Sequence, residues 1–150
     1  MSPAQERAEK QATEGASHAP KITRSHARAK WHKHSAADLE ARSRAFANQH
    51  AIWTTLASEG DAVEVQLLDL GLVRAEDTLA QDARDALQGQ IPGAATYDRV
   101  SRSLVVVCQG GEHLLGVQRV KQAGRKAVEA REWFNGLQHR SRATQVLRFV

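Results

Sequence analysis

With 150 residues, of which 41% are hydrophobic and 25% charged, the chain has the size and composition of one globular domain with a modest core. Its apolar runs of about five residues are far shorter than the roughly 20 that a transmembrane helix needs, which excludes a membrane span. A single cysteine cannot form an internal disulfide, and the polar first 15 residues lack the apolar stretch of a secretory signal.

The formal net charge of +4 is unevenly distributed along the chain. Residues 16–44 carry +5, residues 57–98 carry −7 and residues 117–150 carry +6. If the fold gathers the two basic segments on one face, they form a surface for a polyanion. The alternative is that the acidic middle neutralises them locally, and charge alone leaves both open.

The first half of the chain predicts a linker, a helix and a hairpin. Residues 1–20 have almost no large apolar side chains and read as a disordered linker. Ser35 is placed to cap a helix over residues 36–47. The next two segments, 51–56 and 63–67, are rich in β-branched residues or alternate in polarity, which indicates two paired strands.

The second half predicts more strands and one helix. Residues 73–90 are ambiguous between a helix and a long loop. Strands are expected at residues 96–97, 104–108 and 114–120, with Gly110-Gly111 as the turn between the last two. A short helix over 127–134 is expected to end at Gly136. The basic tail either frays or docks through its apolar residues, which are Val146, Leu147, Phe149 and Val150.

These elements predict a mainly β fold with short helices (α+β), arranged as a small open β-barrel. We expect residues 1–20 to be an interdomain linker, 21–140 the barrel domain and 141–150 a basic tail. We also expect a monomer.

No catalytic or metal site is predicted. The seven histidines include the close pair His32 and His34, but no other ligand cluster completes a metal site. Cys108 ends an apolar run and reads as an inert core residue rather than a nucleophile.

Basic residues are the functional signal that the composition supports. Neutralising nucleic-acid phosphates needs such charges, whereas the simpler interpretation is an ordinary solvated surface. One group consists of Lys21, Arg24, Arg28, Lys30 and Lys33. The other consists of Arg119, Lys121, Arg125, Lys126 and Arg131.

Three stretches carry a family likeness. The first is Ala19-Pro20-Lys21-Ile22-Thr23, followed by Ala27-Arg28 and Trp31. The second is Ser35-Ala36, Leu39 and Arg44-Ala45-Phe46. The third comprises Ile91-Pro92-Gly93, Leu104 to Cys108, Gly116-Val117, Gly124, Lys126 and Trp133-Phe134-Asn135-Gly136. In this order and spacing they resemble the carboxyl-terminal half of methionyl-tRNA formyltransferases, most of all the mitochondrial form, over about residues 15–140.

The resemblance implies a five-stranded barrel similar to an oligonucleotide-binding fold, which helps to hold the acceptor arm of initiator tRNA during translation initiation. It implies a tRNA-binding role for Lys21, Arg24, Arg28, Lys30, Lys33, Arg119, Lys121, Arg125 and Lys126. The family's Asn-Pro-Trp-Pro-Gly type turn is replaced here by residues 47–51.

No segment matches the family's catalytic domain, so we expect a fragment that is inactive alone and binds no cofactor. In the full-length family enzyme, 10-formyltetrahydrofolate donates the formyl group, and the resemblance implies the mitochondrial matrix as the location. One alternative is that the chain complements a separate catalytic chain. Another is a structural module of a formyltransferase-like protein that acts on other substrates.

Overall fold

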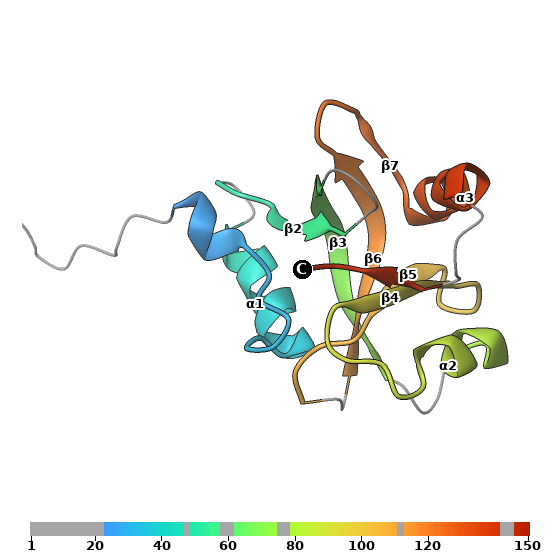
Figure 1. Ribbon diagram of the computed structural model, residues 1–150. Coiled ribbons are helices and arrows are strands. Elements are labelled where there is room, and N and C mark those ends of the chain that lie inside the picture. Colours follow the sequence, from blue (N-terminus) through green and yellow to red (C-terminus); the bar gives the residue numbers. More distant parts are fainter. Residues whose placement is uncertain (1–22, 47–48, 58–61, 75–78, 111–112, 142–145) are drawn as a thin grey trace, which may run out of the picture.

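The computed structural model describes residues 23–46, 49–57, 62–74, 79–110, 113–141 and 146–150, which form a curved antiparallel sheet with short helices around it (Figure 1). In chain order the elements are η1 (Arg24–Ala27, a 3-10 helix), α1 (Ala36–Phe46), β2 (Ile52–Leu56), β3 (Val63–Arg74), α2 (Gln81–Leu87), β4 (Ala94–Asp98), β5 (Ser103–Val106), β6 (His113–Gln122), β7 (Ala127–Glu129), α3 (Ala130–Ser141) and β8 (Leu147–Arg148). The predicted fold class, mainly β with short helices, is confirmed.

The sheet has the strand order β2-β3-β6-β5-β4-β8, and β7 pairs with β6. The end of the chain joins its two edges, as the red strand in Figure 1 shows. Arg148 pairs with Ala94 on β4, while its carbonyl accepts the Ala57 N–H at 2.9 Å. The Val150 N–H donates to the Thr55 carbonyl at 2.8 Å. Residues 146–150 therefore dock, as the second interpretation of the tail predicts.

Phe149 lies at the centre of the hydrophobic core, with only 2% of its surface exposed. Its ring stacks on Trp31 at a centroid distance of 5.9 Å and on Trp133 at 6.3 Å. Aromatic stacks of this kind add to the apolar area that they bury. Three segments far apart in sequence are thus held together at one point.

A second, smaller apolar cluster lies under α2. On β5, Leu104 and Val106 belong to the main core, whereas Val105 packs in the small cluster with Leu79 and Leu87. All four residues of β5 are consequently buried. The ambiguous stretch 73–90 contains the end of β3 and the helix α2, and residues 75–78 lie outside the described part of the chain.

The long β3–β6 ribbon has an irregularity at Asp69, whose φ of 54° is uncommon for a residue with a side chain. Leu68 pairs with Arg119 and Leu70 pairs with Val117, but Asp69 has no partner in the register. On β6, Val117 and Val120 are buried, whereas the two residues between them, Gln118 and Arg119, are both exposed, so the usual alternation of a strand is interrupted here. The irregularity thus turns two consecutive side chains of β6 outward.

The helices differ in how well the sequence predicts them. For α1 the prediction is confirmed, because the Ser35 Oγ accepts the Asp38 N–H at 3.1 Å and the helix begins at Ala36. The predicted helix over 127–134 is wrong at its start. Residues 127–129 form β7, where Val128 pairs with Val120, so cross-strand pairing overrides local helix propensity.

The helix α3 runs on to Ser141, so Gly136 lies inside it and is not its carboxyl-terminal cap. Among the described residues, no helix combines the length and apolar composition that a membrane crossing requires.

Candidate nucleic-acid interface

Two arginines of the amino-terminal segment lie over the ring of Trp53 on β2. The guanidinium carbon is 4.0 Å from the ring centroid for Arg24 and 5.4 Å for Arg28. The Trp53 indole N–H donates to the Arg24 carbonyl at 2.9 Å, and the Ala29 N–H donates to the Trp53 carbonyl at 2.9 Å. Cation–π contacts and backbone hydrogen bonds therefore hold this basic segment against the sheet.

Arg24 also forms an ion pair with Glu64 on β3. The side chains are 52% and 37% exposed, so solvent screens the pair and its contribution to stability is at most about 1 kcal/mol. The contact matters more for position than for energy, since it fixes the guanidinium of Arg24 over the tryptophan.

The sheet register brings a lysine of β6 onto the same surface. Trp53 pairs with Gln66, and Gln66 pairs with Lys121 on β6. Residues directly opposite each other project from the same side of a sheet, and adjacent strands are about 4.8 Å apart. Two strand spacings thus place the backbone of Lys121 about 10 Å from that of Trp53, the residue on which the two arginines lie. We call this surface, consisting of Arg24, Arg28, Trp53, Gln66 and Lys121, the Trp53 face.

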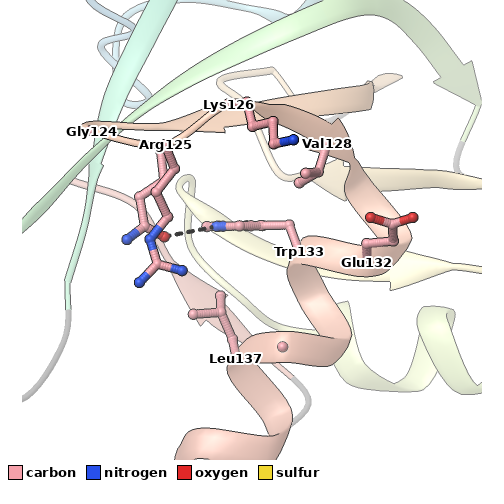
Figure 2. A pocket seen from close by; sticks show the side chains of 9 residues that line it. Gly124, Arg125, Lys126, Val128, Glu132, Trp133 and Leu137 are labelled. Carbon is pink, nitrogen blue, oxygen red and sulfur yellow. Dashed lines mark hydrogen bonds between the residues drawn. The ribbon is translucent and has the colours of Figure 1, made fainter.

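Arg125 and Lys126 lie in the turn between β6 and β7, beside a hollow of about 610 Å³ that α3 closes on its other side (Figure 2). Trp133 forms the floor of this hollow. Its ring is 7% exposed and its N–H donates to the Gln122 side chain at 3.1 Å. Trp133 is therefore a core residue with no free face on which a base could stack, and the two exposed cations above it remain open to solvent.

The other predicted contacts are not all brought together. Lys30 and Lys33 are exposed in a turn whose His34 carbonyl accepts the Gln109 N–H at 3.2 Å, near the β5–β6 hairpin. That hairpin lies at the opposite end of β6 from Arg125 and Lys126 (Figure 1). Lys21 lies outside the described residues.

Sequence reasoning missed a third basic group. Arg99 and Arg102 lie in the turn between β4 and β5, and line one hollow of about 850 Å³ together with Arg119 and Arg131. Arg131 stands in the predicted second group but not among the predicted tRNA contacts, and Arg99 and Arg102 stand in neither. The signal that could have identified this group is a pair of arginines three positions apart in a turn, in the sequence Asp-Arg-Val-Ser-Arg.

Asp98 holds this turn in place. Although fully buried, its carboxylate accepts three backbone N–H groups, from Ala80 at 2.8 Å, Ser101 at 2.8 Å and Val100 at 3.4 Å. Burial raises the pKa of Asp98, but the hydrogen bonds from Ser101, Ala80 and Val100 together outweigh burial and hold it below its ordinary value. The ionised carboxylate is thus a fixed anchor for α2 and for the turn that carries Arg99 and Arg102.

Neither Cys108 nor the described histidines form a reactive or metal-binding group. Burial raises the pKa of the Cys108 thiol to about 12, so it is protonated at neutral pH and a poor nucleophile. Within the described ranges, no three His, Cys, Asp or Glu side chains are grouped so that they could hold a metal ion. Burial, and next the charge of Arg42, lower the pKa of His34.

The profile of the formyl transferase C-terminal domain matches residues 21–138. The chain belongs to this family. The match begins at the first basic segment and extends into α3, so it includes the Trp53 face, the β6–β7 turn and the third basic group.

Two curated relatives share this region. The chain is 29% identical over 129 residues to the mitochondrial methionyl-tRNA formyltransferase of Bos taurus, and 30% identical over 129 residues to that of Homo sapiens. The alignments cover 86% of this chain but only 30% and 31% of those proteins. The resemblance to the carboxyl-terminal part of these enzymes is therefore confirmed, and the chain spans less than a third of their length.

Proposed function

We propose that this domain binds tRNA, through the Trp53 face and the neighbouring β6–β7 turn. The observation that carries the proposal is the row from Trp53 through Gln66 to Lys121, which joins Arg24 and Arg28 of the amino-terminal segment to the basic residues of β6 and the β6–β7 turn. This arrangement favours the one-face interpretation of the two basic segments. The partner is proposed to be initiator methionyl-tRNA, because both relatives are named as methionyl-tRNA formyltransferases.

The chemistry of the surface suits contacts with the nucleic-acid backbone. Arginine presents several donors in a planar fork that matches phosphate oxygens, which applies to Arg24, Arg28 and Arg125. Lys121 and Lys126 add point charges. Such contacts position a nucleic acid without reading its sequence. Specificity for initiator tRNA would thus come from its shape or from another domain.

The test is a titration of the 150-residue chain with fluorescently labelled initiator tRNA at 50 mM and 200 mM salt. We expect a fall in affinity of about 10²-fold or more, because each neutralised phosphate releases condensed counterions. Replacing Lys121, Arg125 and Lys126 together by Ala should reduce the slope of log affinity against log salt concentration by the amount expected for about three phosphate contacts. Equal affinity at both salt concentrations would rule out this mode of binding.

We further propose that formyl transfer takes place in a catalytic domain outside these 150 residues, with 10-formyltetrahydrofolate bound there as donor. The mitochondrial matrix is the proposed location, in keeping with the names of both relatives. The isolated chain should then show no transfer of a formyl group to methionyl-tRNA. Measurable transfer by this chain alone would contradict the proposal.

A further inference from the structure

The hollow beside the β4–β5 turn collects arginines from three parts of the fold. Arg99 and Arg102 come from the turn, Arg119 from β6, and Arg131 from the first turn of α3. The side chain of Tyr97 forms part of the same wall. We call this hollow the arginine pocket.

Its positive charge is largely uncompensated. Arg119 is 3.7 Å from Asp69, with both side chains about half exposed, and Glu129 is the one carboxylate that lines the pocket. Arg99, Arg102 and Arg131 form no ion pair with any residue that the structure describes. Four guanidinium groups around one hollow repel each other unless an anion enters it.

The wall formed by α3 adds to this field. The helix begins at Ala130, which lines the pocket, so the positive end of its dipole adjoins the arginines. Arginine forks and a helix amino terminus both favour phosphate oxygens, and none of the residues that combine them here belongs to the Trp53 face.

The backbone gives a second line of argument. Arg102 has a φ of 58°, in the left-handed region where glycine is the favoured residue. Asp98 fixes the surrounding turn through Val100 and Ser101, so the strained conformation is maintained by the fold. Strained residues that a fold maintains in this way are concentrated at binding sites.

We propose that the arginine pocket binds a phosphate group, and that a backbone phosphate of the bound tRNA supplies it; this second clause rests on the function proposed above. Arg102 is the central contact, since it reaches the pocket from a position that a glycine would occupy with less strain. The tRNA then meets the domain at two adjoining basic sites, the Trp53 face and the arginine pocket, because Lys121 and Arg119 lie two positions apart on β6.

The test compares Arg102→Gly with wild type in the full 150-residue chain. Affinity for tRNA should fall about five- to tenfold, and the salt dependence by about one contact, while the thermal midpoint stays unchanged or rises because glycine relieves the strain. Arg102→Lys keeps the charge and should lose only about twofold to threefold. Arg131→Ala, outside the strained turn, should weaken binding as Arg102→Gly does.

The control is Arg44→Ala on α1, which removes an equal charge from an exposed side chain that pairs with Glu40 at i,i+4 and should change affinity less than twofold. If wild type binds tRNA and neither Arg102→Gly nor Arg131→Ala weakens it, the pocket inference is overturned while the proposed function stands.

A second probe separates the two sources of phosphate. If wild type does not bind tRNA at low salt, the proposed function fails, and the chain is titrated with inorganic phosphate while the arginine Nε–H resonances are followed by NMR. A shift of the Arg102 resonance, assigned by its loss in Arg102→Gly, supports a pocket for free phosphate. No shift in this titration overturns the pocket as well.

Discussion

Arg24 and Arg28 are held over Trp53 by ring contacts, and Arg24 is further paired with Glu64, whereas Arg102 is kept in a strained turn with no ion pair among the described residues. On the Trp53 face the arginines stabilise the domain, because they fix the amino-terminal segment to β2. In the arginine pocket the relation is reversed, because the hydrogen bonds of Asp98 hold the turn that carries Arg102 in its strained conformation. An arginine that already has partners in the domain contributes to its stability as well as to binding, whereas one held without an ion pair contributes to binding alone.

This difference predicts opposite consequences of mutation. Changes at the Trp53 face should reduce stability and tRNA binding together. Changes to arginines of the pocket should reduce binding alone, as proposed above for Arg102→Gly.

The largest effect is expected from Gly93→Ala, which disturbs the packing of Phe149 and Trp31. Trp31 donates a hydrogen bond to Thr54 on β2, the strand that carries Trp53. Gly93 has a φ of 102°, and an added Cβ would lie 2.5 Å from the Phe149 carbonyl oxygen and 3.6 Å from the Trp31 ring. Clash and backbone strain should together cost about 2–4 kcal/mol of unfolding free energy, measured by urea denaturation. Gly110→Ala, with a φ of 96° and no described residue within 4 Å of the added Cβ, carries the strain alone and should cost about 1 kcal/mol. Equal losses for the two variants would contradict the packing argument.

Asp98→Asn weakens the hydrogen bonds that hold the β4–β5 turn of the arginine pocket. It replaces a buried acceptor of three N–H groups by an amide that can accept fewer, so we expect a loss of about 2–3 kcal/mol at pH 7. Asp82→Asn, in the exposed first turn of α2, is the control and should lose less than about 1 kcal/mol.

The loss should depend on pH in a defined direction. Because the folded-state pKa of Asp98 is lowered, its stabilisation is complete above the ordinary carboxyl value of about 3.9 and disappears as the pH falls through the lower folded pKa. The stability gap between wild type and Asp98→Asn should thus be the same at pH 7 and pH 5 and narrow below about pH 3.9. If the stability difference between wild type and Asp98→Asn stayed constant down to strongly acidic pH, the carboxylate charge would not be its cause.

Trp53→Ala tests whether stability and binding are coupled at the Trp53 face. It removes both cation–π contacts and the hydrogen bond to the Arg24 carbonyl, and should cost about 2 kcal/mol and about tenfold in tRNA affinity. Trypsin should then cleave after Arg24 and Arg28 faster than in wild type. Trp53→Phe keeps an aromatic face but loses the N–H donor, so it should show about half of the stability loss. Slow cleavage in Trp53→Ala would mean that other contacts hold the segment.

The smallest effect, and the one of opposite sign, is expected from Glu64→Gln. Removing this carboxylate frees Arg24 and takes one negative charge from the Trp53 face, so tRNA affinity should rise about twofold to threefold. The loss of stability should stay below about 1 kcal/mol, because the pair is exposed. Glu40→Gln breaks the pair with the exposed Arg44 on α1 and should leave affinity unchanged. Weaker binding by Glu64→Gln would show that the ion pair positions Arg24 for the ligand.

The sequence by itself determined the elements whose signals are local. The Ser35 cap predicts the start of α1, and the turn glycine Gly110, with its φ of 96°, falls between two apolar runs that become β5 and β6. The resemblance to the formyltransferase carboxyl-terminal domain likewise came from the order of short motifs. The helix cap and the turn depend on neighbours within a few residues, which is the range over which caps, turns and alternation act, whereas the resemblance depends on the order of motifs over most of the chain.

Only the tertiary structure decided which side chains meet. Val128 belongs to a strand because it pairs with Val120. Phe149 enters the core because the end of the chain pairs with the two edge strands, β4 and β2. Arg102 and Arg131 share one pocket although 29 positions apart, since the sheet folds the β4–β5 turn against the start of α3. Spacing along the chain does not encode distance across a barrel, because strand register and closure set that distance.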